Sequence, residues 1–422
     1  MPVNDIHAPF IAFARTLLPD EKHRTVFDRM AERSGIAHRF SALKAGNLEA
    51  GEVDASRFYI RGRFPGTEAR MALYETQALA LASRAVDALG IRQERERITH
   101  LIVASCTGFT APGLDLQLGE ALGLRPDLSR TLVGFMGCSA AVPALRIASQ
   151  TVRADPSARV LVINLELCSL HLQETADIET VLSFLLFGDG GTAALVTADP
   201  HGIALGDFRS AVIPDSQDLI TWRIGDSGFQ MHLSGKVPGR IARALREEAA
   251  RNNADGLLRG EGTHAVDLWA VHGGGRTVLD AVEAGLNLPA AALVHSRAVL
   301  HAFGNMSSAT LMFVLRRMLA QAEADDGRGA DRHSNADARV GADSGSDPNF
   351  GAEMGSAMRK GSATEAGTDG GTITGRRGFA LAFGPGMVAE TFRFTLVSGD
   401  PIISDGIPHY RDARNLAGTG GT

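Results

Sequence analysis

The central part of the chain alternates short apolar, β-branched runs with longer stretches of helical character. Between about Ile98 and Ala320, THLIVASC is followed by LDLQLGEALGL, RTLVGFMG by CSAAVPALRIASQTV, and then comes ARVLVINLEL. The theme returns in DLWAVHGGG followed by RTVLDAVEAGL, and we expect GFALAFGPG and AETFRFTLVSG to be the last strands. This alternation predicts an α/β fold whose sheets are covered by helices.

A stretch near the C-terminal end breaks the alternation. From about Ala322 to Arg377 the residues Gly, Ala, Asp, Ser and Arg dominate, and apolar residues are scattered. Such a segment cannot bury enough apolar surface to offset the entropy lost on ordering, so we expect a disordered surface insertion over 322–377. We also expect a loosely held tail over 397–422.

The length of the chain allows more than one folding unit. With 422 residues, 44% of them hydrophobic and 21% charged, the chain can bury a large core as two linked domains or one duplicated unit. We expect an N-terminal half over 1–200 and a C-terminal half over 201–396, the second interrupted by the insertion.

Composition argues against several classes of function. No run reaches the ~18 to 20 uncharged apolar residues that a membrane helix needs, and the start MPVNDIHAPF lacks a basic segment followed by an apolar one. Cys106, Cys138 and Cys168 are too few and too widely spaced for a disulfide framework or a CxxC metal site. We therefore expect free thiols and a cytoplasmic protein. The net charge of −6 argues against a nucleic-acid partner, which would need a broad basic surface.

Cys138 lies where an apolar strand meets a predicted helix, in GFMGCSAAVPALRIA. A thiol at a helix N-terminus faces unpaired N–H groups and the positive end of the helix dipole, and both favour the nucleophilic thiolate. A cysteine among small apolar residues is about as often a core residue, and Pro143 fits a regular helix start imperfectly.

Two further polar residues lie beside glycine-containing turns. His272 ends an apolar strand in DLWAVHGGGRTVLDAVE, and Asn305 precedes an apolar helix in LHAFGNMSSATLMFVL. Alone, the histidine would more often be structural and the asparagine a helix cap. With Cys138 they form a different set, because cysteine can carry an acyl thioester while histidine and asparagine donate hydrogen bonds to a developing oxyanion. Decarboxylative Claisen chemistry requires such a set.

At this point the sequence resembles a known family, the chalcone and stilbene synthase superfamily of type III polyketide synthases, and within it the bacterial type. The motifs GCSAAVPAL, LLFGDGGTAAL, WAVHGGGRTVLDAVE, GNMSSAT and GFALAFGPG occur in the family's order and cover roughly residues 25–395 outside the insertion. The resemblance implies a thiolase-type α/β fold, in which two duplicated αβαβα halves form a five-layered core, and it implies a homodimer.

The resemblance also implies roles for single residues. Cys138 would hold the acyl starter and the growing chain, while His272 and Asn305 would polarise malonyl-CoA so that loss of CO2 leaves a stabilised enolate. His272 would in addition keep Cys138 ionised as an imidazolium–thiolate pair. Phe187 matches a gatekeeper between the CoA tunnel and the reaction cavity. No cofactor, carrier protein, nucleic acid or membrane is implied, only CoA thioesters.

A basic helix near the N-terminus contacts the CoA phosphates in family members. Here VFDRMAERSGI matches that helix with Arg29 and Arg33, which project from one helix face because they are four residues apart. Val26 stands where the family often has lysine, and solvated surface charges are the alternative reading. The glycines after His272 would let CoA approach the backbone at Gly274 and Gly275. The chain also begins later than family members usually do, without their first strand.

The family's motifs place a further set of residues around the reaction cavity: Cys106, Thr107, Ala111, Cys168, His171, Trp222, Met231 and Ser307. Met231 replaces a second gatekeeping phenylalanine, and Ala111 replaces a methionine that reaches across the dimer. The small side chains leave room for an aliphatic starter, although Trp222 and His171 add bulk. We expect a fatty acyl-CoA or malonyl-CoA starter and a resorcinol or pyrone product; phloroglucinol and chalcone-like products stay open.

Two other functions fit parts of the pattern. A ketoacyl-carrier-protein synthase of the fatty-acid initiation type uses the same fold and the same Cys, His and Asn chemistry, and a requirement for acyl carrier protein would distinguish it. A non-catalytic acyl-CoA-binding protein of this fold would bind acyl-CoA without acylation of Cys138.

Overall fold

The computed structural model describes residues 1–251, 253–331 and 375–397. Within this part of the chain, a first four-stranded sheet has the order β4–β3–β5–β6. Strand β3 pairs in parallel with both β4 and β5, and β5 pairs antiparallel with β6. The strands are β3 (His100–Ser105), β4 (Ser129–Gly134), β5 (Val160–Glu166) and β6 (Gly190–Val196).

A second four-stranded sheet of the described residues has the order β10–β11–β12–β7. Strand β11 pairs in parallel with β10 and antiparallel with β12, as β5 does with β3 and β6 in the first sheet. The two sheets are therefore similar in topology although they come from different parts of the sequence. The strands are β7 (Gly202–Val212), β10 (Leu268–Val271), β11 (Arg377–Gly384) and β12 (Val388–Val397).

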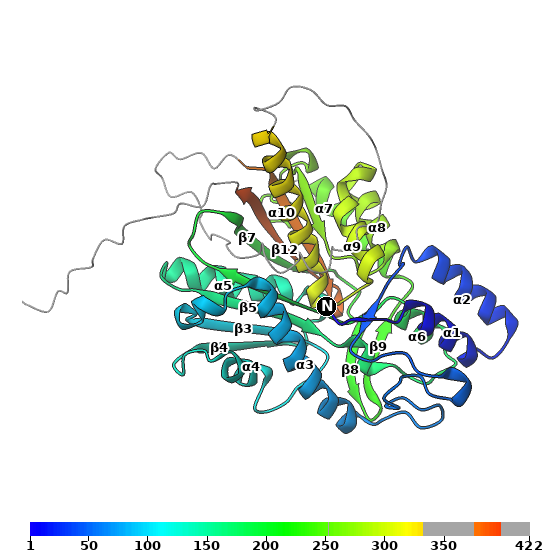
Figure 1. Cartoon of the computed structure of the whole chain (residues 1–422). Coiled ribbons are helices and arrows are strands. Elements are labelled where there is room, and N and C mark those ends of the chain that lie inside the picture. Colours follow the sequence, from blue (N-terminus) through cyan, green and yellow to red (C-terminus); the bar gives the residue numbers. More distant parts are fainter. Residues whose placement is uncertain (252, 332–374, 398–422) are drawn as a thin grey trace, which may run out of the picture.

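Helices cover the sheets in layers (Figure 1). The outer face of the first sheet carries α3 and α4, and the second sheet is covered by α7, α8 and α9. Helices α5 and α10 lie between the sheets. Their bounds are α3 (Thr67–Leu89), α4 (Leu114–Leu122), α5 (Ala141–Ala154), α7 (Val237–Arg251), α8 (Arg276–Leu286), α9 (Val294–Phe303) and α10 (Ser308–Asp331).

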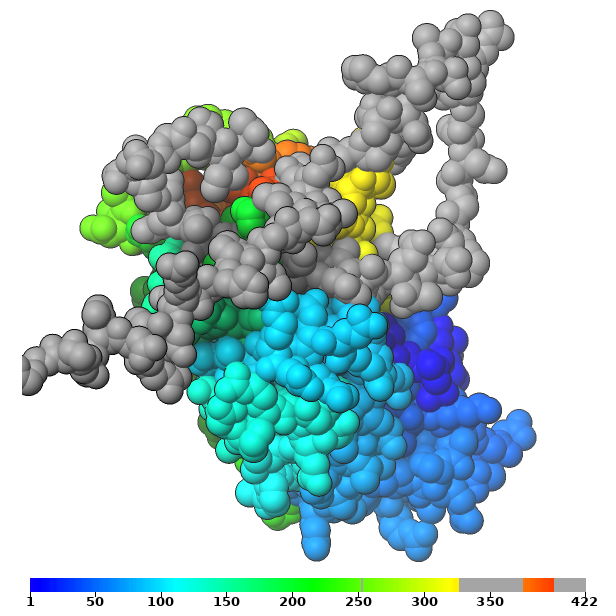
Figure 2. Space-filling view, turned by 60° about the vertical axis from the view of Figure 1, so that its left-hand side comes forward, coloured from blue at the N-terminus to red at the C-terminus, as the bar shows by residue number. Residues whose placement is uncertain are grey.

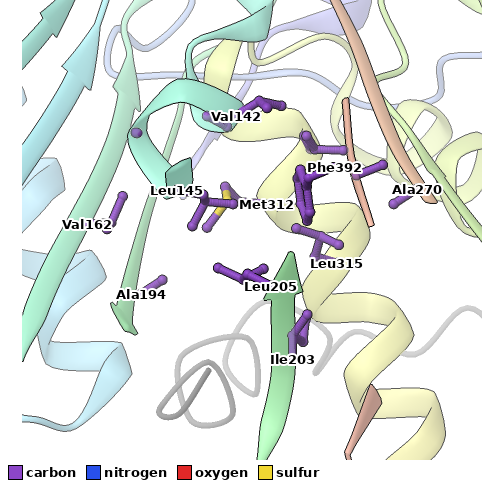
Figure 3. Packing of buried hydrophobic residues seen from close by; sticks show 14 of the residues in the cluster. Val142, Leu145, Val162, Ala194, Ile203, Leu205, Ala270, Met312, Leu315 and Phe392 are labelled. Atoms are coloured by element: carbon purple, nitrogen blue, oxygen red, sulfur yellow. The ribbon is translucent and has the colours of Figure 1, made fainter. Parts of the chain in front are cut away.

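The largest cluster of buried apolar side chains joins the two sheets. Leu145 from α5 and Met312 from α10 lie among residues from both sheets, such as Val162 of β5 and Phe392 of β12 (Figure 3). Met312 is 1% exposed and Phe392 is fully buried. Because burial of apolar surface is the main favourable term in folding, this shared core fixes one sheet against the other.

Smaller elements surround the ends of the sheets. Helices α1, α2 and α6 form a group with its own apolar cluster. Two antiparallel strand pairs lie beside it: β1–β2, whose strands are separated by α1 and α2 in the sequence, and the hairpin β8–β9. These elements are β1 (Asn4–Asp5), α1 (His7–Leu17), α2 (Glu21–Arg33), β2 (Phe40–Ser41), α6 (Ile178–Phe184), β8 (Ile220–Gly225) and β9 (Gly228–Leu233). Short 3₁₀ turns include η3 (Gly137–Ser139) and η4 (Cys168–His171).

The α/β prediction is confirmed, and every strand and helix expected from the apolar runs is present at its place. The predicted start of the insertion is wrong, because α10 continues to Asp331 and residues 322–331 are helical. The Ala, Glu and Arg residues of this segment are good helix formers, and a scarcity of apolar residues does not prevent them from extending an existing helix. Residues 332–374 and most of the tail lie outside the described part of the chain.

No helix formed by the described residues combines the length and the apolar character that crossing a membrane requires.

Candidate active site

Cys138, His272 and Asn305 come from three distant segments and line one cavity. Cys138 lies in the turn η3 that connects β4 to α5, His272 follows β10, and Asn305 precedes α10. The cavity holds about 840 Å³ of empty space, part of it open to solvent, and its wall is mostly apolar. The layered core therefore brings together at one place the three residues that the sequence singled out.

The turn that carries Cys138 depends on a glycine. Gly137 has φ +56°, and a Cβ at this position would lie 2.5 Å from the Cδ of Pro385. Glycine is the residue that combines a positive φ with such a close approach. The Cys138 Sγ lies 4.0 Å from both the Oδ1 and the Nδ2 of Asn305.

Asn305 is held by hydrogen bonds on both sides of its amide. Its Nδ2 donates to the Gly274 carbonyl at 3.2 Å, and its Oδ1 accepts from the Ser307 backbone N–H at 2.8 Å. An amide nitrogen has two N–H groups, and the second is directed at the Cys138 Sγ at 4.0 Å, where an acyl group on that thiol would lie.

His272 is 2% exposed, and neither ring nitrogen has a hydrogen-bond partner among the described residues. Its backbone is fixed, because its N–H donates to the Leu381 carbonyl at 2.8 Å in the second sheet. Buried polar atoms are usually paired, so an unpaired imidazole in a cavity wall is a group ready for a ligand.

Burial opposes charge on both Cys138 and His272. Burial raises the pKa of the Cys138 thiol to about 11, although hydrogen bonds from Ser307 and Asn305 act in the opposite direction. Burial also lowers the pKa of His272 to about 4. Taken one at a time, the two groups are therefore neutral at pH 7, and the ion pair implied by the family resemblance requires that their mutual attraction outweighs this effect.

Phe187 lies directly beside Asn305 in the backbone. The Asn305 N–H donates to the Leu186 carbonyl at 2.8 Å, and the Gly188 N–H donates to the Asn305 carbonyl at 2.9 Å. The Phe187 side chain lines the cavity.

Most of the other residues expected around the cavity do line it: Cys106, Thr107, Cys168, Trp222, Met231, Ser307 and Gly274. Trp222 and Met231 are cross-strand partners in the β8–β9 pair. The Trp222 indole N–H donates to the Cys106 carbonyl at 2.8 Å, which fixes the ring against the wall.

Three expected residues are not part of the cavity lining: Ala111, Gly275 and His171. Ala111 is exposed. His171 is fully buried behind the wall, where its ring lies 4.2 Å from the Phe229 ring and hydrogen-bonds the Thr107 carbonyl at 2.7 Å. Burial lowers the pKa of His171 to about 3, so the ring is neutral and acts as a support.

Arg29 and Arg33 project from α2 and are exposed. Neither takes part in an ion pair with any of the described residues, so both are available to an anion.

Sequence reasoning missed much of the apolar wall, which comes from elements on several sides: Phe184, Ile220, Leu233, Val237, Ile241, Val278, Phe383 and Pro385. It also missed Glu166, which is fully buried behind Cys106 and Thr107 and accepts hydrogen bonds from both and from Ser308. Burial raises the pKa of Glu166 to about 7. A charged residue at the end of the apolar run ARVLVINLEL was the available signal.

Within the described ranges, no group of His, Cys, Asp or Glu side chains is arranged to hold a metal ion.

Comparison with known proteins identifies the family. Residues 11–200 match the model of chalcone and stilbene synthases, N-terminal domain, and residues 207–338 match that of the C-terminal domain. The chain is 33% identical over 304 residues to the alpha-pyrone synthesis polyketide synthase-like Pks18 of Mycobacterium tuberculosis, and the match covers 69% of this chain and 76% of that protein.

Solved structures agree with this result. The chain superposes on a polyketide synthase, PKS-I, from the brown alga Ectocarpus siliculosus with a TM-score of 0.73 and 26% identity, over 94% of this chain and 96% of that one. It superposes on the bacterial type III polyketide synthase 1,3,6,8-tetrahydroxynaphthalene synthase of Streptomyces coelicolor with a TM-score of 0.69 and 26% identity, over 94% and 97%. These neighbours have the thiolase fold, which confirms the predicted fold class. The chain therefore belongs to the chalcone and stilbene synthase family and is an acyltransferase of the type III polyketide synthase class.

Proposed function

We propose that the enzyme loads an acyl-CoA starter on Cys138, extends it by repeated decarboxylative Claisen condensation with malonyl-CoA, and cyclises the product. One observation carries this assignment: the Asn305 amide, whose Nδ2 lies 4.0 Å from the Cys138 Sγ, and the imidazole of His272, unpaired among the described residues, line the same apolar cavity as the thiol. A thioester on Cys138 would have two hydrogen-bond donors within the same enclosed space.

These groups suffice for the chemistry. The Cys138 thiolate attacks the starter thioester and releases CoA. Asn305 and His272 then donate to the thioester oxygen of malonyl-CoA, where negative charge develops as the carbon–carbon bond to CO2 breaks. The resulting carbon nucleophile attacks the acyl group on Cys138 and frees the thiolate, so the extended chain, now on CoA, can be loaded again.

We propose that Cys138 and His272 act as an ion pair in spite of their burial. Transfer of the thiol proton to the imidazole creates two opposite charges in one enclosed site, and their attraction is strong where water is excluded. The N–H groups at the start of α5 add to the stabilisation of the thiolate.

Arg29 and Arg33 would bind the phosphates of CoA, because both are exposed on one face of α2 and neither forms an ion pair with a residue that the structure describes. Phe187 would separate the CoA entrance from the reaction space, since its side chain lines the cavity beside Asn305.

On this mechanism the enzyme needs neither a cofactor nor a carrier protein. Three free thiols fit activity in the reducing cytoplasm.

The starter we propose is a fatty acyl-CoA or malonyl-CoA, and the product a pyrone or a resorcinol. The predominantly apolar wall suits an aliphatic chain. The alpha-pyrone synthesis after which one relative is named supports a pyrone product.

We also propose that the chain consists of two halves that divide near residue 200.

Two chains, we propose, associate through the edge of the first sheet. Among the strands of the described residues, β4 pairs on one side only, with β3, and most of its residues are exposed. Leu132 on β4, Leu116 on α4 and Phe109 are apolar side chains at least 43% exposed. Figure 2 shows that the segment carrying α4 and β4, drawn in cyan to green, lies at the surface. An exposed edge strand with apolar side chains is a template for pairing with a second chain.

Cys138→Ala should abolish turnover. We expect the rate of product formation from malonyl-CoA and an acyl-CoA starter to fall by at least about 10³-fold, because the other two thiols of the cavity wall, Cys106 and Cys168, are buried and burial raises the pKa of each well above its usual range. Mass spectrometry of the wild type should show one acyl adduct per chain on the peptide that contains Cys138. Product formation by the variant, or a wild type that works only with acyl carrier protein, would contradict the proposal.

His272→Gln should shift the pH dependence of Cys138 reactivity. If the imidazolium stabilises the thiolate, its loss raises the pKa of Cys138 toward the value of about 11 that burial favours. Iodoacetamide alkylation of Cys138, followed between about pH 6 and pH 10, should then be about tenfold slower at pH 7. His301→Gln, an exposed histidine on α9, serves as the control. Equal profiles for wild type and His272→Gln would rule out the ion pair.

Met231→Trp should narrow the cavity opposite Trp222. We expect kcat/KM for dodecanoyl-CoA to fall at least about tenfold and that for acetyl-CoA less than about threefold, because only the longer chain needs the lost space. Gln230→Trp adds the same bulk on the exposed side of β9 and should leave both values near wild type. A uniform loss with both starters would show that the space beside Met231 does not select the starter.

Light scattering should give a mass of twice that of one chain. Leu132→Lys places a charge in the proposed interface and should weaken the dimer at least about tenfold, as measured by the concentration dependence of the mass. A wild-type protein that stays monomeric at micromolar concentration would refute the interface.

A further inference from the structure

Arg39, which directly precedes β2, is a buried cation close to the active-site cavity. Its side chain is among the largest that are fully buried, at 1% exposed. One nitrogen, Nη1, donates to the carbonyl of Phe184 at 2.7 Å and to the carbonyl of Phe187 at 2.6 Å. The Nε donates to the Nδ1 of His7 at 3.0 Å. A single guanidinium thus ties two carbonyls of one segment to the N-terminal part of the chain.

Both carbonyls belong to phenylalanines whose side chains line the cavity. Phe184 is the last residue of α6, and Phe187, three residues later, pairs with Asn305 in an isolated β-bridge. We propose that Arg39 is a positioning residue, which sets the direction of Phe184 and Phe187 and thereby the width of the cavity beside Cys138. This inference rests on the proposed function, because it concerns the space in which the acyl chain would be extended.

The surroundings of Arg39 are built for a close fit. Gly304, with φ +67°, approaches so closely that a Cβ there would lie 2.7 Å from the Cγ of Arg39 and 2.9 Å from the Leu186 carbonyl oxygen. A Cβ on Gly188 would lie 3.4 Å from the Cβ of Arg39. The Arg39 side chain thus packs tightly where the segment of Phe187 meets the segment of Asn305. A displacement of this side chain would therefore shift the backbone of both segments.

Burial of the Arg39 charge costs folding free energy. Among the described residues, no carboxylate forms an ion pair with the guanidinium, and the Asp5 carboxylate accepts only from the Arg39 backbone N–H, at 3.4 Å. The Nη2 has no partner there, and the guanidinium carbon lies 4.6 Å from the centre of the Phe10 ring. Burial lowers the pKa of Arg39 to about 9, against a weaker opposite effect of Asp5 and Asp189. Burial also lowers the pKa of His7 to about 4, so His7 is neutral and its Nδ1 accepts the Arg39 proton. The planar guanidinium of Arg39 donates to the Phe184 and Phe187 carbonyls and to His7 in one fixed geometry. A lysine ammonium does not reproduce that geometry.

A double-mutant cycle tests whether Arg39 acts through Phe187. The variants are Arg39→Lys, Phe187→Leu and the double variant. For each, the rate of Cys138 alkylation by iodoacetamide is compared with that by the bulkier N-cyclohexylmaleimide, using peptide mass spectrometry to separate Cys138 from Cys106 and Cys168. When Phe187 is present, we expect Arg39→Lys to raise the ratio of the two alkylation rates, N-cyclohexylmaleimide over iodoacetamide, at least about fivefold. In the Phe187→Leu background we expect less than about a twofold change, because residues that act through one another are not additive.

The preference for dodecanoyl-CoA over acetyl-CoA, measured as a ratio of kcat/KM values, should follow the same pattern. Arg92→Lys, an exposed arginine paired with Asp87, is the matched control and should leave both ratios unchanged. If Arg39→Lys does not fold, Arg39→Gln provides the same test, since it removes the buried charge together with the forked donor.

The possible results separate the two proposals. Equal changes in both Phe187 backgrounds, or folded Arg39 variants with only a lower melting temperature and unchanged ratios, would overturn the positioning role. A wild type that makes no polyketide would instead overturn the proposed function, and the alkylation ratios would still decide the role of Arg39.

Discussion

The burial of three polar groups in one apolar wall is the constraint on which the rest of the structure depends. A thiol and an imidazole that lie in an apolar wall cost more free energy to ionise than they do in water. The same apolar surroundings strengthen the hydrogen bonds that they and the Asn305 amide form with a ligand. Burial is the largest cause of the opposite pKa directions of Cys138 and His272. The protein keeps such a site because a thioester oxygen that becomes negative is best stabilised by fixed donors with no competing solvent.

The layered core supplies the rigidity that such a site needs. Cys138 follows a strand of the first sheet, His272 follows a strand of the second, and Asn305 opens the helix that lies between them. The apolar contacts of α5 and α10 with both sheets therefore decide the distances among the three groups. A change deep in this core, far from the cavity, would be transmitted to the reacting atoms because interiors are close-packed.

The sequence predicted the parts of the molecule in which local pattern and burial agree. Apolar runs such as THLIVASC are central strands buried on both faces, and glycines beside Cys138, His272 and Asn305 mark turns of restricted geometry. The pattern did not predict β8 and β9, whose residues are largely half-exposed and mixed in polarity. It did not reveal Arg39 or Glu166 as buried, since burial of a charge depends on carbonyls and hydroxyls that distant segments supply. The helical start of the expected insertion was missed because helix extension requires propensity and an existing helix, but no apolar surface.

The unpaired ring of His272 has a chemical consequence. In most buried histidines a protein acceptor holds one nitrogen and so decides which of the two carries the hydrogen. Here neither nitrogen is held by the described residues, so the bound reactant selects the tautomer. A reaction that alternates between loading and decarboxylation brings different groups to this ring in turn. An imidazole that no protein group holds can accept a hydrogen bond in one half of the cycle and donate one in the other.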